Sequence, residues 1–255
     1  MTFVSIKSVY SGSTVIFTCG VVISNFLVSI TLIGFKAADS PNSRRQASLN
    51  ALTFSAGMPL AQLHWLIADR PGSITVESTA DGLHIYDNPV GVLANNPPFP
   101  MQLFSLNNYM ALSPQSPKNT FAPDAPLSVY SRGMGALGLP GDLSSGSRFV
   151  RAAFTKLHSV CGESEADCVG QFFHIMETVS QTRGCCEVAP GEFERTIYTS
   201  CWNAARGIYY YTTYTNRRIS AVELRREDLD AAALIRYPMR TREDIFYQNA
   251  PGTES

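Results

Sequence analysis

Two stretches decide how this chain folds: residues 91–97, which read GVLANNP, and residues 138–151, which read GLPGDLSSGSRFVR. In the first stretch, Asn95 precedes a second asparagine and two prolines, so its backbone has little conformational freedom. In the second stretch, a glycine-containing loop leads into an apolar helical pattern, and Arg148 falls in the first turn of the expected helix. The other elements are predicted outward from these two stretches.

Strands are predicted on the N-terminal side of Asn95. Alternating apolar residues indicate strands at 60–68, 73–78, 83–86 and 90–94, the last of which ends at Asn95. Asp81-Gly82 lies between two of these runs. This dipeptide predicts a tight hairpin, because glycine adopts a positive φ at little cost.

A helix and a long loop are predicted next. A helical period over 101–110 follows Pro98, which suits the start of a helix. Residues 113–146 are rich in Pro, Ser, Gly and Asn, which predicts a long loop with a role at a site. Ser145 or Ser147 is expected to cap the helix that follows.

The remaining pattern completes the fold class. A second helix is predicted at about 165–180, with an apolar face that suits a core. An antiparallel meander is predicted from strands at 193–202, 207–214 and 218–224. Runs of strands, then helices, then strands indicate the α+β class.

Composition bounds the class of protein. The chain has 255 residues, of which 45% are hydrophobic, and this is enough for a buried core. Its 20 Lys and Arg residues against 21 Asp and Glu residues give a net charge of −1, which argues against nucleic acid as a partner. We predict three parts. Residues 1–48 form an atypical apolar N-terminal segment that ends in a polar linker, where the composition is polar from 41 to 50. A globular domain follows at 49–248, and a tail at 249–255.

The N-terminal segment is apolar from Thr14 to Phe35 and is long enough to cross a bilayer. Four interpretations stay open. The segment is a membrane anchor, a secretory signal, a pair of buried strands at 14–18 and 21–33 that breaks near Gly20, or an accident of how the gene begins.

Six cysteines are too few and too irregularly spaced for a disulfide-stapled module, which favours a reducing, cytosolic setting. His158, Cys161, Cys168 and His174 lie close together in sequence. Their spacing matches no common zinc site, so the alternative to a metal site is a pair of thiols in a helix-loop-helix.

Two residues are candidates for chemistry. An amide held as rigidly as that of Asn95 suits an oxyanion hole, and the alternative is an asparagine that caps a turn. Arg148 is suited to lowering the pKa of a thiol or binding a carboxylate, and the alternative is a salt bridge to Asp142. The tyrosines at 209–211 suit sheet packing better than a binding groove.

The order of sequence blocks resembles the later part of the choloylglycine hydrolases, which cleave conjugated bile salts, and of the related penicillin V acylases. The matching blocks are LHWLIAD (63–69), HIYDN (84–88), LFSLNNY (103–109), GQFFHI (170–175), YTSC (198–201) and GIYYYTTY (207–214). The resemblance implies an Ntn-hydrolase fold, a four-layer α-β-β-α sandwich. We expect this sandwich to be incomplete, because blocks of the early part of the family are not found.

The resemblance also implies chemistry. In this family an N-terminal cysteine attacks the amide, its own amino group acts as base, and water hydrolyses the resulting thioester. Asn95 matches the family's oxyanion asparagine, with Ala94 in place of the usual threonine, and Arg148 matches the arginine beside the nucleophile. No nucleophile is assigned, because Cys19 only loosely imitates the family's spacing.

We therefore expect a bile salt hydrolase homologue that needs no cofactor or metal and is inactive or weakly active as an isolated chain. One alternative is a penicillin V acylase-like amidase. Another is a non-catalytic fragment, membrane-tethered through Thr14 to Phe35 or completed by a partner, that binds amphipathic acids. The resemblance also suggests a homo-oligomer, and we expect the chain to self-associate.

Overall fold

The computed structural model describes residues 3–5, 10–11, 14–23, 26–34, 63–69, 72–233 and 235–249. Up to residue 34 the description covers backbone strands only. The chain divides into two compact units, residues 37–180 and residues 1–36 with 181–255, and each is described by itself. The linker predicted at 41–50 and most of the predicted tail lie outside the described residues.

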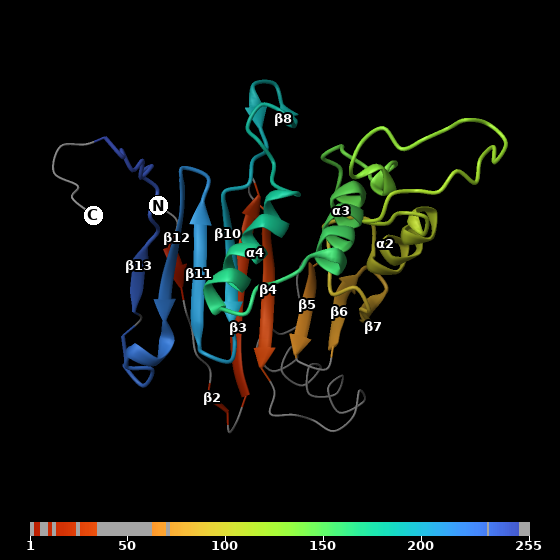
Figure 1. Ribbon diagram of the computed structural model, residues 1–255. Helices are drawn as coiled ribbons and strands as arrows, with labels where there is room; N and C mark the ends of the chain where they lie inside the picture. Colours follow the sequence, from red (N-terminus) through yellow and green to blue (C-terminus); the bar gives the residue numbers. More distant parts are fainter. Residues whose placement is uncertain are drawn as a thin grey trace. The chain divides into compact units, whose positions relative to one another are not determined.

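The unit of residues 37–180 contains a three-stranded antiparallel sheet (Figure 1). Its strands, in spatial order, are β5 (Leu63–Asp69), β6 (Gly72–Thr79) and β7 (Gly82–Asp87). The hairpin predicted at Asp81-Gly82 is confirmed, since Gly82 has a φ of +132° and pairs with Thr79. The Thr79 hydroxyl donates to the Asp81 carboxylate at 2.6 Å and so stabilises this turn.

The strand predicted at 90–94 is wrong. Residues 88–98, here called the site segment, have no regular secondary structure. In this segment, side chains form the hydrogen bonds to backbone carbonyls that a neighbouring strand would otherwise form. Asn88 Nδ2 donates to the Val92 carbonyl at 2.8 Å, and Lys156 Nζ donates to the Val90 carbonyl at 2.8 Å. Asn95 is therefore reached through an irregular turn and not at the end of a strand.

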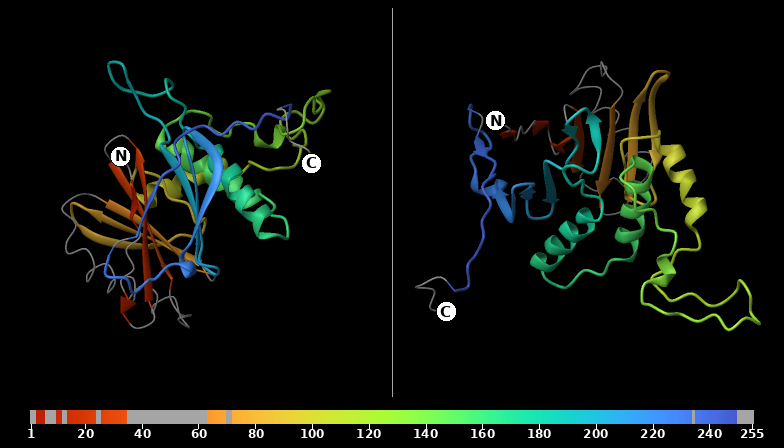
Figure 2. Two further views of the ribbon diagram at one scale, coloured as in Figure 1. Left: turned by 90° about the vertical axis from the view of Figure 1, so that its left-hand side faces the viewer. Right: turned by 90° about the horizontal axis from the view of Figure 1, so that it is seen from above.

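Two helices lie against the sheet (Figures 1 and 2). Helix α2 (Phe99–Ser105) begins directly after Pro98, as predicted, and continues into the short 3-10 helix η1 (Leu106–Tyr109). Helix α3 spans Ser145–His158. The core between them contains edge-to-face rings of Phe99 and Phe149, with centroids 6.4 Å apart. The same cluster buries Val90, Ala94, Val150 and Ala153.

The N-terminus of α3 differs from the prediction. Its cap is Ser144, whose hydroxyl accepts the Ser147 backbone N–H at 3.3 Å. Neither Ser145 nor Ser147 caps the helix, because the Ser145 hydroxyl accepts the Asn96 backbone N–H at 2.8 Å and the Ser147 hydroxyl donates to Asp142.

Helix α4 (Glu165–Glu177) begins at a capping box formed by Ser164 and Asp167. It ends at Glu177 instead of continuing to residue 180. Its apolar face is partly core, as predicted, because Val169 and Phe173 are buried.

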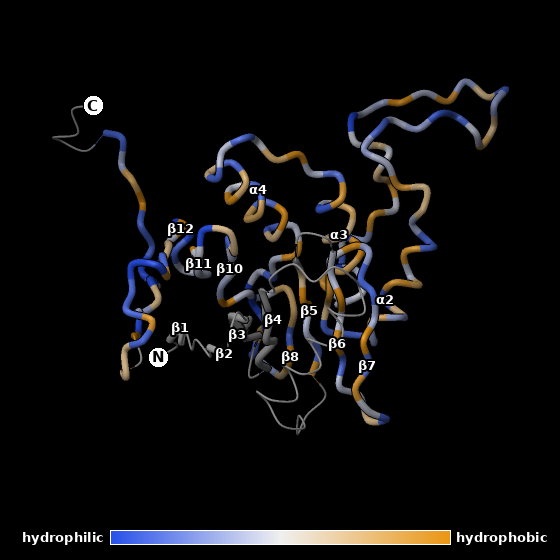
Figure 3. Tube along the Cα trace, turned by 90° about the horizontal axis from the view of Figure 1, so that it is seen from below, coloured by the Kyte–Doolittle hydropathy of each residue, from blue (hydrophilic) through white to orange (hydrophobic). Residues whose placement is uncertain are grey.

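The loop predicted at 113–146 is confirmed up to residue 133, and its predicted role at a site stays a prediction. Residues 113–133, here called the exposed loop, have no helix or strand, and the one-turn helix η2 (Met134–Ala136) follows them. Apolar positions recur along this loop (Figure 3). Phe121 is 94% exposed and Tyr130 is 81% exposed, so this part of the loop buries few of its own side chains.

The other unit contains the predicted meander. Its strands are β10 (Tyr198–Asn203), β11 (Ile208–Thr213) and β12 (Asn216–Glu223), paired antiparallel in that order. Tyr209 and Tyr211 are buried in this sheet, which agrees with packing as their role. A small hairpin of β8 (Glu187–Ala189) and β9 (Glu192–Phe193), and the pairing of β1 (Phe3–Ser5) with β13 (Arg236–Pro238), were not predicted.

The apolar N-terminal segment forms strands. β3 (Thr14–Ile23) and β4 (Phe26–Gly34) pair antiparallel, and β2 (Tyr10–Ser11) pairs with β3. The strand interpretation is therefore confirmed, although burial of these strands lies outside the description; β3 continues through Gly20, so the predicted break there is wrong. In the part of the chain that the structure describes, no helix is long and apolar enough to span a bilayer.

Candidate active site

The structure brings the two candidate residues into direct contact. Arg148 Nη2 donates to Asn95 Oδ1 at 3.0 Å, although the residues are 53 positions apart in sequence. Arg148 Nε also donates to the Leu143 carbonyl at 3.2 Å, which fixes the plane of the guanidinium. Both side chains are half-buried.

The contact orients the Asn95 carboxamide. A guanidinium has only donors, so the group facing Arg148 must be the amide oxygen. The Asn95 Nδ2 donors then point away from Arg148, and among the described residues they donate to no protein group. A fixed amide with free donors beside a permanent positive charge suits the stabilisation of a developing oxyanion.

Asn88 holds the start of the site segment. Its side chain is only 2% exposed, and its Nδ2 donates to the Thr75 hydroxyl at 2.9 Å and to the Val92 carbonyl. Its Oδ1 accepts the Gly91 N–H at 2.7 Å. Gly91 has a φ of +61°, a backbone conformation that favours glycine, and a Cβ there would also displace the end of the Lys156 side chain, 2.7 Å away.

Glu77 holds the other end of the site segment. This carboxylate is 4% exposed and accepts the Phe99 N–H with both oxygens at 3.0 Å, at the start of α2. Its charge is favourable there because the first N–H groups of a helix carry partial positive charge. Sequence reasoning missed Glu77, and the signal that could have found it is a charged residue at an inward position of a strand.

The salt bridge considered between Arg148 and Asp142 is wrong. The Asp142 carboxylate accepts instead from the Ser144 N–H at 2.9 Å and from the Ser147 hydroxyl. Hydrogen bonds from Ser144 and Ser147 hold the pKa of Asp142 well below its usual range. Arg148 is consequently directed to Asn95, while Arg151 Nη1 binds the carbonyls of Pro140 and Asp142 at 2.8 and 2.7 Å.

The sequence also matches a family of known proteins. The sequence profile of the linear amide C–N hydrolases, choloylglycine hydrolase family, matches residues 46–237. The chain belongs to the choloylglycine hydrolase family. Asn95 and Arg148 both fall inside the matched range.

Individual members of the choloylglycine hydrolase family are similar to the chain. A bile salt hydrolase/transferase from Lactiplantibacillus plantarum is 54% identical over 205 residues, which cover 80% of this chain and 63% of the relative. The chain thus spans just under two thirds of that protein. A crystal structure of a mutant conjugated bile acid hydrolase from Clostridium perfringens superposes with a TM-score of 0.70 at 33% identity, covering 85% of this chain and 67% of that one.

The fold is α+β and of the Ntn-hydrolase kind, as the resemblance implied. A penicillin V acylase from Agrobacterium tumefaciens has a TM-score of 0.51 at 19% identity, with coverage of 75% of this chain and 55% of that chain, and so shares the fold alone. The matched family is one of linear amide C–N hydrolases.

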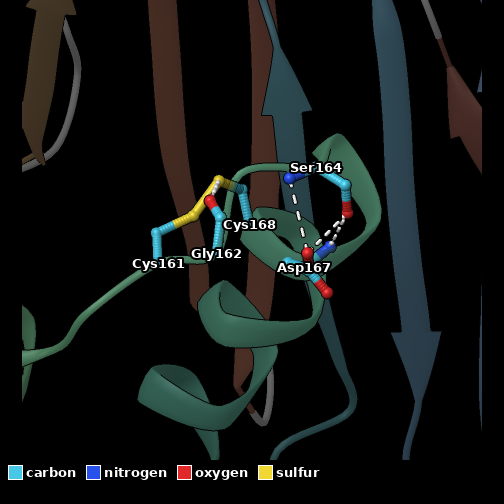
Figure 4. Close-up of a disulfide and its surroundings, with 5 residues drawn as sticks. All are labelled: Cys161, Gly162, Ser164, Asp167 and Cys168. Carbon is cyan, nitrogen blue, oxygen red and sulfur yellow. Dashed lines mark hydrogen bonds between the residues drawn. A yellow bond between two sulfur atoms is a disulfide. The ribbon is translucent and has the colours of Figure 1, made fainter.

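The cysteines near α4 are not a pair of thiols. Cys161 and Cys168 form a disulfide, with Cα atoms 5.2 Å apart, beside the capping box of Ser164 and Asp167 (Figure 4). The chain turns back between them so that α4 can start, and this turn makes the bond geometrically accessible. No cluster of metal ligands is found in the described part of the chain. Cys19 lies in β3, and its side chain is outside the described residues.

Proposed function

We propose that the reaction served by the site of Asn95 and Arg148 is hydrolysis of the amide bond that joins a bile acid to glycine or taurine. Asn95 and Arg148 lie at the reacting carbonyl in this proposal. The single observation that carries it is the 3.0 Å hydrogen bond from Arg148 to Asn95, within a chain 54% identical to a bile salt hydrolase. Water is consumed, and the products are a free bile acid and the amino acid.

The chemistry of the two residues follows from their geometry. As a nucleophile attacks the amide carbonyl, charge builds on its oxygen, and the Asn95 Nδ2 donors stabilise it without having to reorient. Arg148 holds the Asn95 amide in the productive orientation. By the family resemblance, its charge also favours the thiolate form of a nearby cysteine.

A conjugated bile salt is preferred over penicillin V as the substrate. The supporting observation is the difference in similarity, 54% identity to the bile salt hydrolase against 19% to the penicillin V acylase. Glycocholate, taurocholate and penicillin V should be compared at equal concentration, with released amine measured in each case. Faster hydrolysis of penicillin V than of either bile salt would reverse the preference.

The isolated chain is proposed to turn over little, because no nucleophile is assigned in it. The test uses a completed chain, in which the part of the Lactiplantibacillus plantarum relative that precedes its match is joined in front of residues 49–255. The completed chain should release glycine from glycocholate. The isolated chain should be slower by several orders of magnitude, as is typical when a catalytic nucleophile is missing.

Two outcomes would contradict the proposal. Turnover by the isolated chain at the rate of the completed chain would show that its own residues include the nucleophile. A completed chain that folds, as judged by a cooperative thermal transition, yet releases neither glycine nor taurine would reject bile salt hydrolysis.

A further inference from the structure

Gln102 is an unusual residue of α2, because its polar side chain is almost completely enclosed. It is 1% exposed, which places it among the most buried side chains of the described residues. Buried amides are costly unless their donors and acceptor are paired. Gln102 meets this condition with three hydrogen bonds, and all three go to the backbone of the site segment.

The bonds of Gln102 bracket Asn95. Gln102 Oε1 accepts the Ala94 N–H at 3.0 Å, and Nε2 donates to the Ala94 carbonyl at 2.8 Å. Nε2 also donates to the Pro97 carbonyl at 2.6 Å. The carboxamide thus pairs with both backbone groups of Ala94, as a neighbouring strand would, and reaches the residue on the far side of Asn95 and Asn96.

Other contacts complete this frame around Asn95. The Asn96 N–H donates to the Ser145 hydroxyl at 2.8 Å, and Arg148 binds the Asn95 side chain. Gln102 belongs to α2, whereas Ser145 and Arg148 are residues of α3, so two different helices hold this segment. Removing Gln102 leaves the α3 contacts intact but frees the backbone on either side of Asn95.

We propose that Gln102 is a positioning residue that aims the Asn95 carboxamide by fixing the backbone from Ala94 to Pro97. This inference rests on the proposed function, in which Asn95 stabilises the oxyanion. A displacement of about 1 Å in such a group costs on the order of 100-fold in rate. The effect of Gln102 is therefore expected on the chemical step and not on substrate affinity.

The variant that isolates the role is Gln102→Met, which keeps the length of the side chain and removes all three hydrogen bonds. Some loss of stability is expected, because three backbone groups lose their partners. The matched control is Val76→Ala. Val76 is fully buried in β6 and contacts no backbone group of the site segment through hydrogen bonds, so this variant lowers stability without loosening Asn95.

The first measurement is amide hydrogen exchange of the full chain, followed by mass spectrometry of peptides. In Gln102→Met, exchange at residues 94–96 should rise by about 10-fold or more, while peptides of β6 change by less than about 3-fold. In Val76→Ala the pattern should reverse. Unchanged exchange at 94–96 in a folded Gln102→Met chain would overturn the positioning role, whatever the chain catalyses.

The second measurement separates positioning from folding. In the completed chain, Gln102→Met should lower kcat for glycocholate by about 10- to 100-fold per folded molecule, with KM within about 3-fold of the parent. Val76→Ala should leave kcat per folded molecule within about 2-fold. Equal loss in both variants would show a merely structural role. If the parent itself has no activity, the proposed function fails, and the exchange experiment alone decides whether Gln102 positions Asn95.

Discussion

The site segment and the exposed loop both lack regular secondary structure, yet they are held in opposite ways. The site segment forms hydrogen bonds with side chains of β6, α2 and α3, including Gln102 and Lys156. In the exposed loop, Asn119 bonds only to Ala122 and Ala125, within the loop itself. The absence of helix or strand therefore says little about rigidity, which depends on whether distant elements supply the hydrogen bonds.

Among the residues that support Asn95, the largest effect is expected for Arg148, which links the site segment to α3. In the completed chain, Arg148→Met should lower kcat for glycocholate by about 100-fold, because the Asn95 amide loses its orientation and the nearby charge disappears. Arg132→Met in the exposed loop is the control and should leave kcat within about 2-fold. Equal effects of the two variants on kcat would show that the site segment is no more important for catalysis than the exposed loop.

Two asparagines with similar bonds give the next test. Asn88→Ala should lower the free energy of unfolding by about 2–3 kcal/mol, because the buried groups that bond the Asn88 side chain lose their hydrogen-bond partner. The Asn119 side chain likewise makes three hydrogen bonds, all of them to backbone groups, but Asn119 is only half-buried. Asn119→Ala should therefore cost less than about 1 kcal/mol in urea denaturation. A larger cost for Asn119→Ala would show that the exposed loop carries stability.

The exposed loop should affect association more than folding. Phe121→Ser together with Tyr130→Ser should change the free energy of unfolding by about 0.5 kcal/mol or less, because both side chains are already in water. We expect the parent chain to self-associate through exposed apolar area, and this variant to do so less. Size-exclusion chromatography with light scattering measures the association of the parent and of the variant, and urea denaturation measures the free energy of unfolding. A monodisperse parent monomer would contradict the expectation.

The smallest effect concerns Asp142, in the turn directly before α3. Its hydrogen bonds from Ser144 and Ser147 hold its folded pKa below the ordinary value of 3.8, so the stability they contribute is complete above pH 3.8 and is lost as pH falls through the lower folded pKa. Asp142→Asn should therefore be less stable than the parent at neutral pH, and the difference should shrink under acid. A difference that grows as pH falls below 3.8 would contradict this sign.

The elements that sequence predicts well are those with a local cause. The Asp81-Gly82 hairpin, the helix after Pro98 and the meander at the end of the chain follow from turn residues and apolar periodicity. Asn95 and Arg148 are candidates from their local sequence, the family resemblance gives them roles, and their mutual contact adds a geometry that spacing does not contain.

The elements that sequence misses depend on distant partners. Residues 90–94 have the apolar alternation of a strand, but Lys156 and Gln102 take the backbone bonds that would define one. The cap of α3 moved to Ser144 because Asn96 and Asp142 engage the other two serines. The disulfide between Cys161 and Cys168 was missed because the turn that brings them together has no distinctive local signal.

The measurement that tests the central claim most directly is glycine release from glycocholate by the completed chain, beside its Asn95→Ala and Asn119→Ala variants. Removal of one oxyanion donor costs about 100- to 1000-fold in kcat in comparable sites, so Asn95→Ala should fall by that factor. Asn119→Ala should match the parent within about 2-fold. A folded Asn95→Ala variant with parental kcat would contradict the account.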